Sequence, residues 1–409
     1  ESVIGLLENG AVPAGDFSPW EGSVLHRSMI LRWHNEEYAP YPPAKRKERV
    51  MARIHRWIEM ELKKSPSAAA MKDRKKKSAA REKAYSAKWP KYDPLTIYKQ
   101  IFRAVKVPED WPAEAPESIP PEVLASTVKE LKKGILHEED LPPLLYIHYL
   151  LNGNEGGSGF DHIVIDEAQD FSPFQIAVLD LYVKGHSFTI LGDLSQGIHA
   201  YKGVHAWEEM QTLFAPEHTA YHALTRSYRS TMEIIEFANG ILSAGVGSSL
   251  LAVPVFRSGN PVRLISYGQP LPASAAGGDR RIQAVRTALA SLSGREYRTL
   301  AVLTRSLREA AELYTELAGH FEDIHLIDGS MTEYRGGLSV LPVYLSKGLE
   351  FDAVILADAD SDHYGGAAWD AKLMYVGCTR ALHELWILHG EGLPPYLQNG
   401  EGTVQGWPE

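Results

Sequence analysis

Two adjacent carboxylates follow a short apolar run near the middle of the sequence. Residues 160–165, Phe-Asp-His-Ile-Val-Ile, lead directly into Asp166 and Glu167. The run predicts a buried strand, and ligands bind beyond the carboxyl ends of strands in open α/β folds. There Asp166 can hold Mg²⁺ and Glu167 can orient and deprotonate a water, which is the chemistry of nucleotide hydrolysis. The alternative is a pair of acids that favours the N-terminus of a helix.

A second apolar run, residues 187–191, predicts another strand and ends in a loop that continues to Gly203. This loop reads G-D-L-S-Q-G-I-H-A-Y-K-G. Together with D-E-A-Q-D at 166–170, it resembles motifs III and II of superfamily 1A helicases, the UvrD/Rep group. The resemblance implies that Gln196 senses a γ-phosphate. It also implies that Tyr201 stacks on a nucleic-acid base, with Lys202 beside it in the same nucleic-acid-binding loop. The alternative for Tyr201 is a tyrosine packed in an interface.

Three later segments resemble further motifs of the same family, in the family's order. They are residues 224–231 for motif IV, 343–355 for motif V and 373–382 for motif VI. The resemblance therefore extends over residues 160–390. It implies ATP and Mg²⁺ as cofactors and Asp166 as the Mg²⁺ ligand.

The same resemblance assigns a role to each matching side chain. Arg229 and Arg380 contact the phosphates from the second domain, Arg380 as an arginine finger, so that hydrolysis releases the charges that hold the two domains closed. Glu350 binds the ribose, above a turn formed by Lys347 and Gly348.

The phosphate loop of such enzymes, G-x-x-x-x-G-K-[ST], is not in this sequence. No Gly-Lys-Ser or Gly-Lys-Thr occurs, and the glycine-rich stretch 153–159 has no lysine. The loop cradles the β- and γ-phosphates through its amides and lysine. The intact later motifs favour an upstream segment that lies outside this sequence, and we expect residues 1–409 alone to be inactive. The alternative is a degenerate relative.

Motif V departs from the UvrD pattern, because Pro342 and Tyr344 stand where the family has a threonine and a histidine that touch single-stranded DNA. This departure, with the stretches 33–46, 89–95, 131–136 with 142–146, and 341–348, resembles the HelD group, ATPases that act on RNA polymerase. The favoured function is thus a HelD-like ATPase that remodels or recycles RNA polymerase. One alternative is an ATP-dependent 3′–5′ DNA helicase of repair, similar to DNA helicase IV or UvrD. Another is a non-enzymatic module that binds nucleic acid or polymerase.

The elements that must position these residues alternate between short apolar runs and helical patterns after residue 160. We expect an α/β fold of RecA-like (P-loop NTPase) parallel-sheet domains, the first one incomplete, plus a helical inserted subdomain. The expected bounds are 1–152 for the helical subdomain, 153–223 for the first RecA-like part, 224–395 for the second and 396–409 for a fraying tail. Strands are predicted at 162–165, 188–191, 262–265, 299–303, 324–327, 339–343, 353–356 and 385–388. Helices are predicted at 44–63, 72–88, 122–133, 174–183, 231–242, 279–292, 306–319 and 371–382.

Charge is distributed unevenly along the 409 residues, whose formal net charge is −10. Residues 41–91 contain 17 Lys and Arg against 5 Asp and Glu, a net of +12. This basic arm on an acidic body predicts a polyanionic partner, DNA or RNA, whereas the alternative is a solvated helical face.

Composition limits the class of protein. No apolar run reaches the ~18 residues of a membrane span, and no secretory signal opens the chain. The single cysteine, Cys378, excludes an internal disulfide and is expected to be a packing residue. These features predict a cytoplasmic protein with no membrane partner, and they leave the oligomeric state undetermined.

Overall fold

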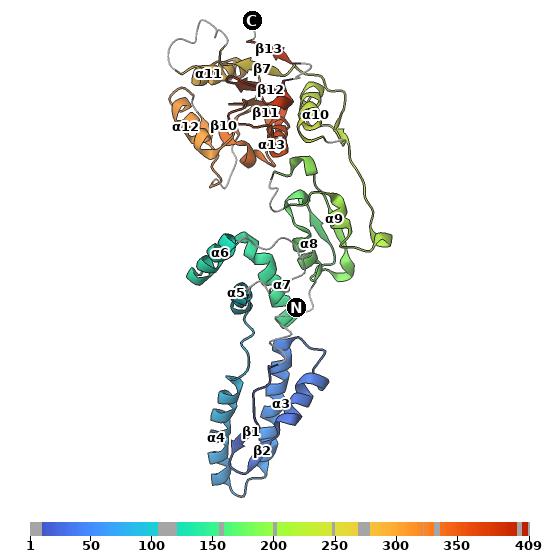
Figure 1. Cartoon of the computed structure of the whole chain (residues 1–409), viewed down its shortest axis with the longest axis vertical. Helices are drawn as coiled ribbons and strands as arrows, with labels where there is room; N and C mark the ends of the chain where they lie inside the picture. The colour runs from blue at the N-terminus through green and yellow to red at the C-terminus, as the bar shows by residue number, and fades with distance from the viewer. Residues whose placement is uncertain are drawn as a thin grey trace. The chain divides into compact units, whose positions relative to one another are not determined.

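The computed structural model describes residues 10–104, 121–154, 159–198, 203–247, 250–268, 279–321, 323–330, 336–398 and 403–407. The chain divides into two compact units (Figure 1). One contains residues 1–163 and 174–189, and the other contains residues 164–173 and 190–409.

A seven-stranded sheet organises the second unit. Its spatial order is β13-β7-β12-β11-β8-β10-β9, and every pair of neighbouring strands in it is parallel. The strands are β7 (Arg263–Ser266), β8 (Thr299–Thr304), β9 (Ile324–Leu326), β10 (Gly337–Pro342), β11 (Phe351–Leu356), β12 (Ala381–His389) and β13 (Val404–Gln405). This confirms the predicted α/β class with a parallel sheet.

Helices cover both faces of this sheet because successive strand residues point to opposite sides. In β8, Leu303 packs in one apolar cluster with α10 (Met232–Val246) and α13 (Ala368–Cys378). Its neighbour Val302 packs in another with α11 (Arg280–Ser293) and α12 (Leu307–Leu317). Figure 1 shows the two helix pairs on opposite sides of the strands. Both faces are therefore apolar, as parallel sheets require.

The amino ends of two adjacent strands bring together residues that are far apart in sequence. β11 pairs with β12 so that Phe351 lies opposite Ala381, and the amide of Phe351 donates to the carbonyl of Arg380 at 2.9 Å. Because Glu350 and Arg380 immediately precede these strands, they lie at the same edge of the sheet.

Two sequence predictions for this unit are wrong. The helix predicted at 371–382 ends at Cys378, because Ala381 already belongs to β12. The tail predicted to fray is ordered in part, since Tyr396 and Leu397 are buried in a 3₁₀ turn (Pro395–Leu397) and β13 pairs with β7. The tail adds buried apolar surface and a strand to the sheet.

Several shorter elements, which carry some of the predicted motifs, lie outside this large sheet. β3 (Ile163–Ile165) and β4 (Phe188–Ile190) form a two-stranded sheet, and α8 (Pro173–Asp180) lies between them in sequence. The second unit also contains 3₁₀ turns at Ala168–Asp170, Leu194–Gln196, Pro216–His218 and Val343–Ser346, the helix α9 (Trp207–Gln211), and the pair β5 (Arg226–Ser227) and β6 (Val253–Pro254).

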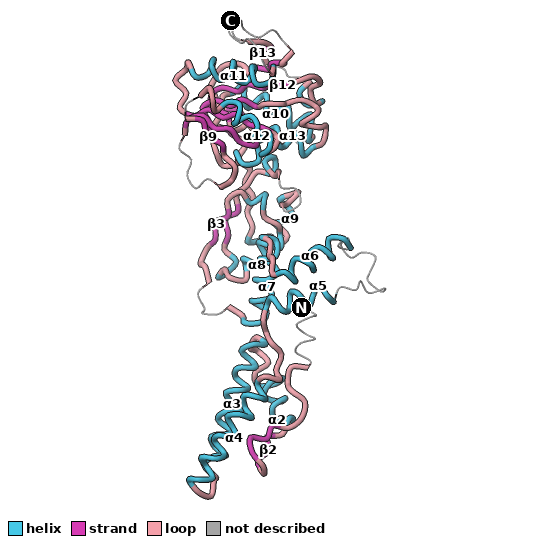
Figure 2. Tube along the Cα trace, turned by 90° about the vertical axis from the view of Figure 1, so that its left-hand side faces the viewer, coloured by secondary structure: helices cyan, strands magenta, loops and turns pink. Residues whose placement is uncertain are grey.

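The first unit begins with an antiparallel hairpin, β1 (Phe17–Trp20) and β2 (Ser23–Leu25), and with α2 (Arg27–Arg32), which runs into a π-helical turn (Trp33–Glu37). Two long helices, α3 (Pro43–Lys63) and α4 (Ala68–Ser86), then lie side by side (Figure 2). α3 buries Val50, Ile54, Ile58 and Leu62, the helical spacing predicted from sequence.

A second apolar cluster in this unit joins α5 (Pro94–Ala104), α6 (Pro121–Lys133) and α7 (Leu141–Asn152), which follows a 3₁₀ turn (Glu138–Asp140). A further 3₁₀ turn spans Lys184–His186. Residues 105–120 and most of the glycine-rich stretch 153–159 lie outside the described residues. Among the helices that the structure describes, none is long and apolar enough to cross a membrane.

Candidate functional site

The turn after β3 exposes the two adjacent carboxylates. The carbonyl of Ile165 accepts from the amide of Leu191 at 2.8 Å, and the amide of Ala168 donates to the carbonyl of Leu191 at 2.8 Å. Between these bonds Glu167 adopts a left-handed conformation, with φ of +53°. Strained backbone of this kind is common at functional sites. Asp166 is exposed and Glu167 is half-exposed, as a site for metal and water requires.

A buried amide that the sequence reasoning did not single out orients Glu167. Gln169 is 1% exposed, and its Nε2 donates to Oε2 of Glu167 at 2.5 Å. Its Oε1 accepts from the amide of Asp193 at 2.9 Å. A Cβ at Gly192 or Gly203 would collide with Gln169, so both positions require glycine. The only signal in the sequence was an amide between carboxylates in D-E-A-Q-D.

Asp193, in the loop after β4, caps the 3₁₀ turn Leu194–Gln196 and so orients Gln196. Asp193 accepts from the amide of Ser195 through Oδ1 and from Nε2 of Gln196 through Oδ2, each at 2.9 Å. This leaves Oε1 of Gln196 to accept from Nη2 of Arg380 at 2.9 Å. The bond connects two residues that the sequence predicted to share a phosphate.

Arg380 is a buried cation, 1% exposed. Its Nε donates to the carbonyl of Val376 at 3.1 Å and its Nη1 to the carbonyl of Leu349 at 3.4 Å. Burial, and after it the nearby charge of Arg229, lowers the pKa of Arg380 to about 10. The guanidinium is therefore still charged at neutral pH. Because its surroundings disfavour that charge, a nearby anion would stabilise the charged form.

Two other cations of the predicted site are paired with carboxylates. Nε of Arg229 lies 2.8 Å from Oε1 of Glu350. Nζ of Lys347 lies 2.6 Å from Oδ2 of Asp170 and 3.4 Å from Oε2 of Glu167, and its side chain is only 11% exposed. These pairs neutralise the acids of the site from within the chain.

The turn predicted at Lys347 and Gly348 is present, since Gly348 has φ of +80°, a conformation that favours glycine. Lys347 itself contacts the carboxylates that follow β3, which sequence reasoning did not foresee. Pro342 is buried at the end of β10, and Tyr344 is 38% exposed. Tyr201 and Lys202, the predicted nucleic-acid contacts, lie outside the described residues.

Helix α13 binds the loop of Gln196 through two side chains that sequence reasoning also missed. Nε1 of Trp369 donates to the carbonyl of Ile198 at 2.6 Å, and Nζ of Lys372 donates to the carbonyl of Leu194 at 3.0 Å. Burial lowers the pKa of Lys372. Their positions three residues apart on one helix face were the available signal.

The donor set matches the γ-phosphate side of a magnesium nucleotide. Mg²⁺ in such sites takes one or two carboxylates together with phosphate oxygens and water. Asp166 and Glu167 can supply the carboxylates. Guanidinium groups match phosphate geometry, which suits Arg229 and Arg380. No group of three or more metal-ligating side chains occurs among the residues that the structure describes.

Two family models match the segments that build this site. Residues 149–211 match the UvrD/REP helicase N-terminal domain, and residues 337–388 match the UvrD-like helicase C-terminal domain. The chain thus contains segments similar to both the N-terminal and the C-terminal domain of UvrD-like helicases. The first match includes Asp166, Glu167 and Gln196, and the second includes Glu350 and Arg380.

Named helicases of other organisms are similar to this chain. DNA helicase IV of Escherichia coli K12 is 26% identical over 262 residues, which cover 59% of this chain and 36% of the relative. A probable DNA helicase of Mycoplasma pneumoniae is 25% identical over 243 residues, 56% of this chain and 43% of the relative. The chain thus spans less than half the length of both relatives.

Among solved structures, the C-terminal domain of a possible DNA helicase from Lactobacillus plantarum WCFS1 is 28% identical. The match covers 44% of this chain and 98% of that domain, with a TM-score of 0.35.

Proposed function

We propose that this UvrD-like chain is the part of an ATP-dependent motor that couples the γ-phosphate to domain movement. The observation that carries the proposal is the hydrogen bond from Arg380 to Gln196, which joins the loop after β4 to the amino end of β12. In a parallel α/β motor, a phosphate that takes Gln196 and Arg380 as partners would control whether these two elements stay together.

Each remaining residue has a defined task in this proposal. Glu167, oriented by Gln169, positions the attacking water and accepts its proton. Asp166 holds Mg²⁺, which supplies charge neutralisation when bound with the nucleotide. Arg229 and Lys347 start from ion pairs within the chain and exchange carboxylate for phosphate oxygens.

We further propose that the motor acts on RNA polymerase in the manner of the HelD group. Two features support this choice over a DNA translocase. Pro342 and Tyr344 occupy positions of motif V where UvrD-like enzymes have side chains that touch DNA. The first unit also provides a pair of long helices, α3 and α4, within the basic residues 41–91, of a form suited to insertion between protein surfaces.

The second candidate is a 3′–5′ DNA helicase. The names of both relatives favour a DNA helicase, without a polarity. A module that binds nucleic acid or polymerase without hydrolysis is the third, favoured by the absence of G-x-x-x-x-G-K-[ST] from these 409 residues.

Measurements of ATP hydrolysis, polymerase binding and duplex unwinding separate the three candidates. They are made on the longest protein that includes this chain and a phosphate loop. We expect magnesium-dependent ATP hydrolysis that Glu167→Gln abolishes, together with co-purification of RNA polymerase. Hydrolysis with unwinding of a 3′-tailed duplex, and no bound polymerase, would instead identify the DNA helicase. Binding of either partner without hydrolysis would identify the module.

A further inference from the structure

The loop that carries Arg229 is anchored through a second arginine. Nη1 of Arg257 donates to the main-chain carbonyl of Arg229 at 2.8 Å. The amide of Met232 donates in return to the carbonyl of Arg257 at 2.9 Å. Arg257 thus bonds to the main chain at Arg229 and at Met232, the first residue of α10. The side chain of Arg229 meanwhile pairs with Glu350.

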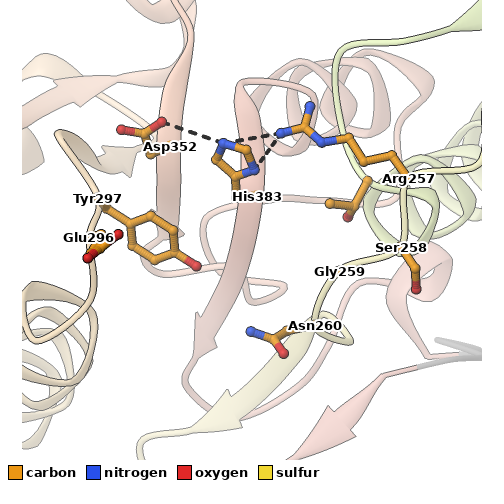
Figure 3. A pocket seen from close by; sticks show the side chains of 9 residues that line it. Arg257, Ser258, Gly259, Asn260, Glu296, Tyr297, Asp352 and His383 are labelled. Atoms are coloured by element: carbon orange, nitrogen blue, oxygen red, sulfur yellow. Dashed lines mark hydrogen bonds and ion pairs between the residues drawn. The ribbon is translucent and has the colours of Figure 1, made fainter.

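Arg257 also reaches the strand that carries Arg380. Its Nη2 lies 2.5 Å from Nδ1 and 3.1 Å from Nε2 of His383 (Figure 3). His383 is three residues beyond Arg380, in β12. Its ring is parallel to that of Tyr297, with an angle of 6° between planes and 6.3 Å between centroids. One guanidinium therefore connects the Arg229 loop to β12 through separate nitrogens.

The connection continues to the strand that carries Glu350. Nε2 of His383 is 3.7 Å from Oδ1 of Asp352, and Oδ2 of Asp352 accepts from the amides of Arg298 and Thr299 at 2.8 and 2.9 Å. Burial acts to raise the pKa of Asp352, but these amide hydrogen bonds outweigh it and lower the pKa, which keeps the carboxylate charged. Asp352 is two residues after Glu350, so the contacts close into a ring around Arg229.

We propose that Arg257 is a positioning residue for Arg229. It fixes the main chain of Arg229 while the side chain exchanges Glu350 for a phosphate, and it keeps Arg229 in register with Arg380 through His383. The buried bond from Oγ of Ser230 to the carbonyl of Ala381, 2.6 Å, supports the same alignment. This role rests on the proposed function for its use in turnover, whereas the anchoring itself does not need a nucleotide.

Arginine is required at position 257 because the side chain must reach two acceptors, the carbonyl of Arg229 and the ring of His383, in different directions. The guanidinium presents five donors in a rigid fork, whereas a lysine ammonium is a single point on a flexible stem. The cavity between these residues, about 360 Å³, leaves the Arg257 side chain room to swing away from His383 once a contact is lost. Neither acceptor alone would therefore hold it.

Hydrogen–deuterium exchange on residues 1–409 tests the anchoring without nucleotide. Arg257→Lys and His383→Phe, the latter keeping a ring against Tyr297, should each speed exchange at the amides of Met232, Val253 and Val255 by about tenfold, the loss of one charge-assisted hydrogen bond. Arg280→Ala, which removes an arginine bonded to the carbonyl of Gly268, is the matched control and should leave these amides unchanged. Unchanged exchange in both test variants overturns the proposal.

Kinetics of the longer protein then tests the consequence for turnover. Arg257→Lys should lower kcat about tenfold and leave the KM for ATP within twofold, since the ground state needs Arg229 less than the transition state does. The double variant with His383→Phe should be no slower than the slower single variant. If both variants exchange faster but the wild-type protein does not hydrolyse ATP, only the proposed function is refuted. If the wild-type protein hydrolyses ATP and the variants show unchanged exchange and wild-type kinetics, only the positioning role is refuted.

Discussion

Arg380 and Gln196, 184 residues apart in sequence, share a hydrogen bond of 2.9 Å between Nη2 and Oε1. Gln196 is held for this contact by Asp193, and Arg380 is held by main-chain carbonyls of α13 and of the turn before β11. Both partners are thus fixed before any ligand binds. The pair connects the loop after β4 directly to the amino end of β12 in the large sheet.

The first prediction concerns Arg380 in a protein that includes a phosphate loop. Arg380→Ala should reduce ATP turnover on the order of 10³-fold, the lower range for an arginine finger, because its charge acts mainly in the transition state. ATP affinity should change far less. Arg380→Lys should not restore turnover, since a single ammonium cannot replace the fork. Turnover and equilibrium binding are measured together, with thermal melting to confirm folding. Equal losses of binding and turnover would contradict this role.

The second prediction concerns residues 1–409 alone. We expect no magnesium-dependent ATP turnover above background, because the amides and lysine that hold β- and γ-phosphates are not in this sequence. A coupled ATPase assay measures this, and Glu167→Gln serves as the baseline. Turnover that Glu167→Gln removes would require a phosphate site of another kind within these residues.

The third prediction concerns the exposed lysines of α4. Lys72, Lys75, Lys76 and Lys83 are exposed, and we expect them to bind a nucleic-acid backbone. Binding of duplex DNA should weaken with salt, with a log–log slope of about −0.9 for each phosphate neutralised. Changing all four to glutamate should flatten that slope. Changing Lys129, Lys132 and Lys133 on α6 to glutamate is the control. A slope that both sets alter equally would indicate only a general effect of net charge.

The fourth prediction concerns close packing around Gln169. Gly203→Ala should destabilise the protein by about 1–3 kcal/mol, because the added Cβ would overlap the main-chain carbonyl of Gln169. Gly240→Ala, in the middle of α10 with nothing within 4 Å, should be neutral or stabilising by up to about 1 kcal/mol. Thermal and urea unfolding of the two variants measure the difference. Equal melting temperatures would mean that the turn moves to accept the methyl group.

The fifth prediction concerns Cys378, which is fully buried in α13. Burial raises the pKa of this thiol, so that it is both protonated and shielded at pH 8. A thiol reagent should not label the native protein and should label it fully in denaturant. Rapid labelling of the native protein would show that α13 opens locally.

Periodicity and family motifs predicted most of the second unit. Alternating residues such as Val302 and Leu303 reveal a strand covered on both faces, and Gln196 and Arg380 were placed in one site by motif order alone. The contacts of Lys347 were not predicted, because an ion pair across 177 residues leaves no local pattern. The role of Gln169 was not predicted because it depends on a second bond, to Asp193, on another loop. The end of α13 was missed because the apolar residues from Leu373 to Leu382 continue from a helix into a strand without a break in their pattern.

The order of the strands in the large sheet has a consequence for synthesis. Among the described strands of this sheet, β7 is the first to be made, yet its neighbours are β12 and β13, the last two. About 115 residues separate Ser266 from Ala381, the start of β12. At about 5–20 residues per second, β7 therefore waits some 6–23 s with Leu264 and Ile265 unpaired after it leaves the ribosome. A nascent chain that ends before residue 381 lacks both of the strands that flank β7 in the folded sheet, so this edge of the sheet forms late however early the rest has folded.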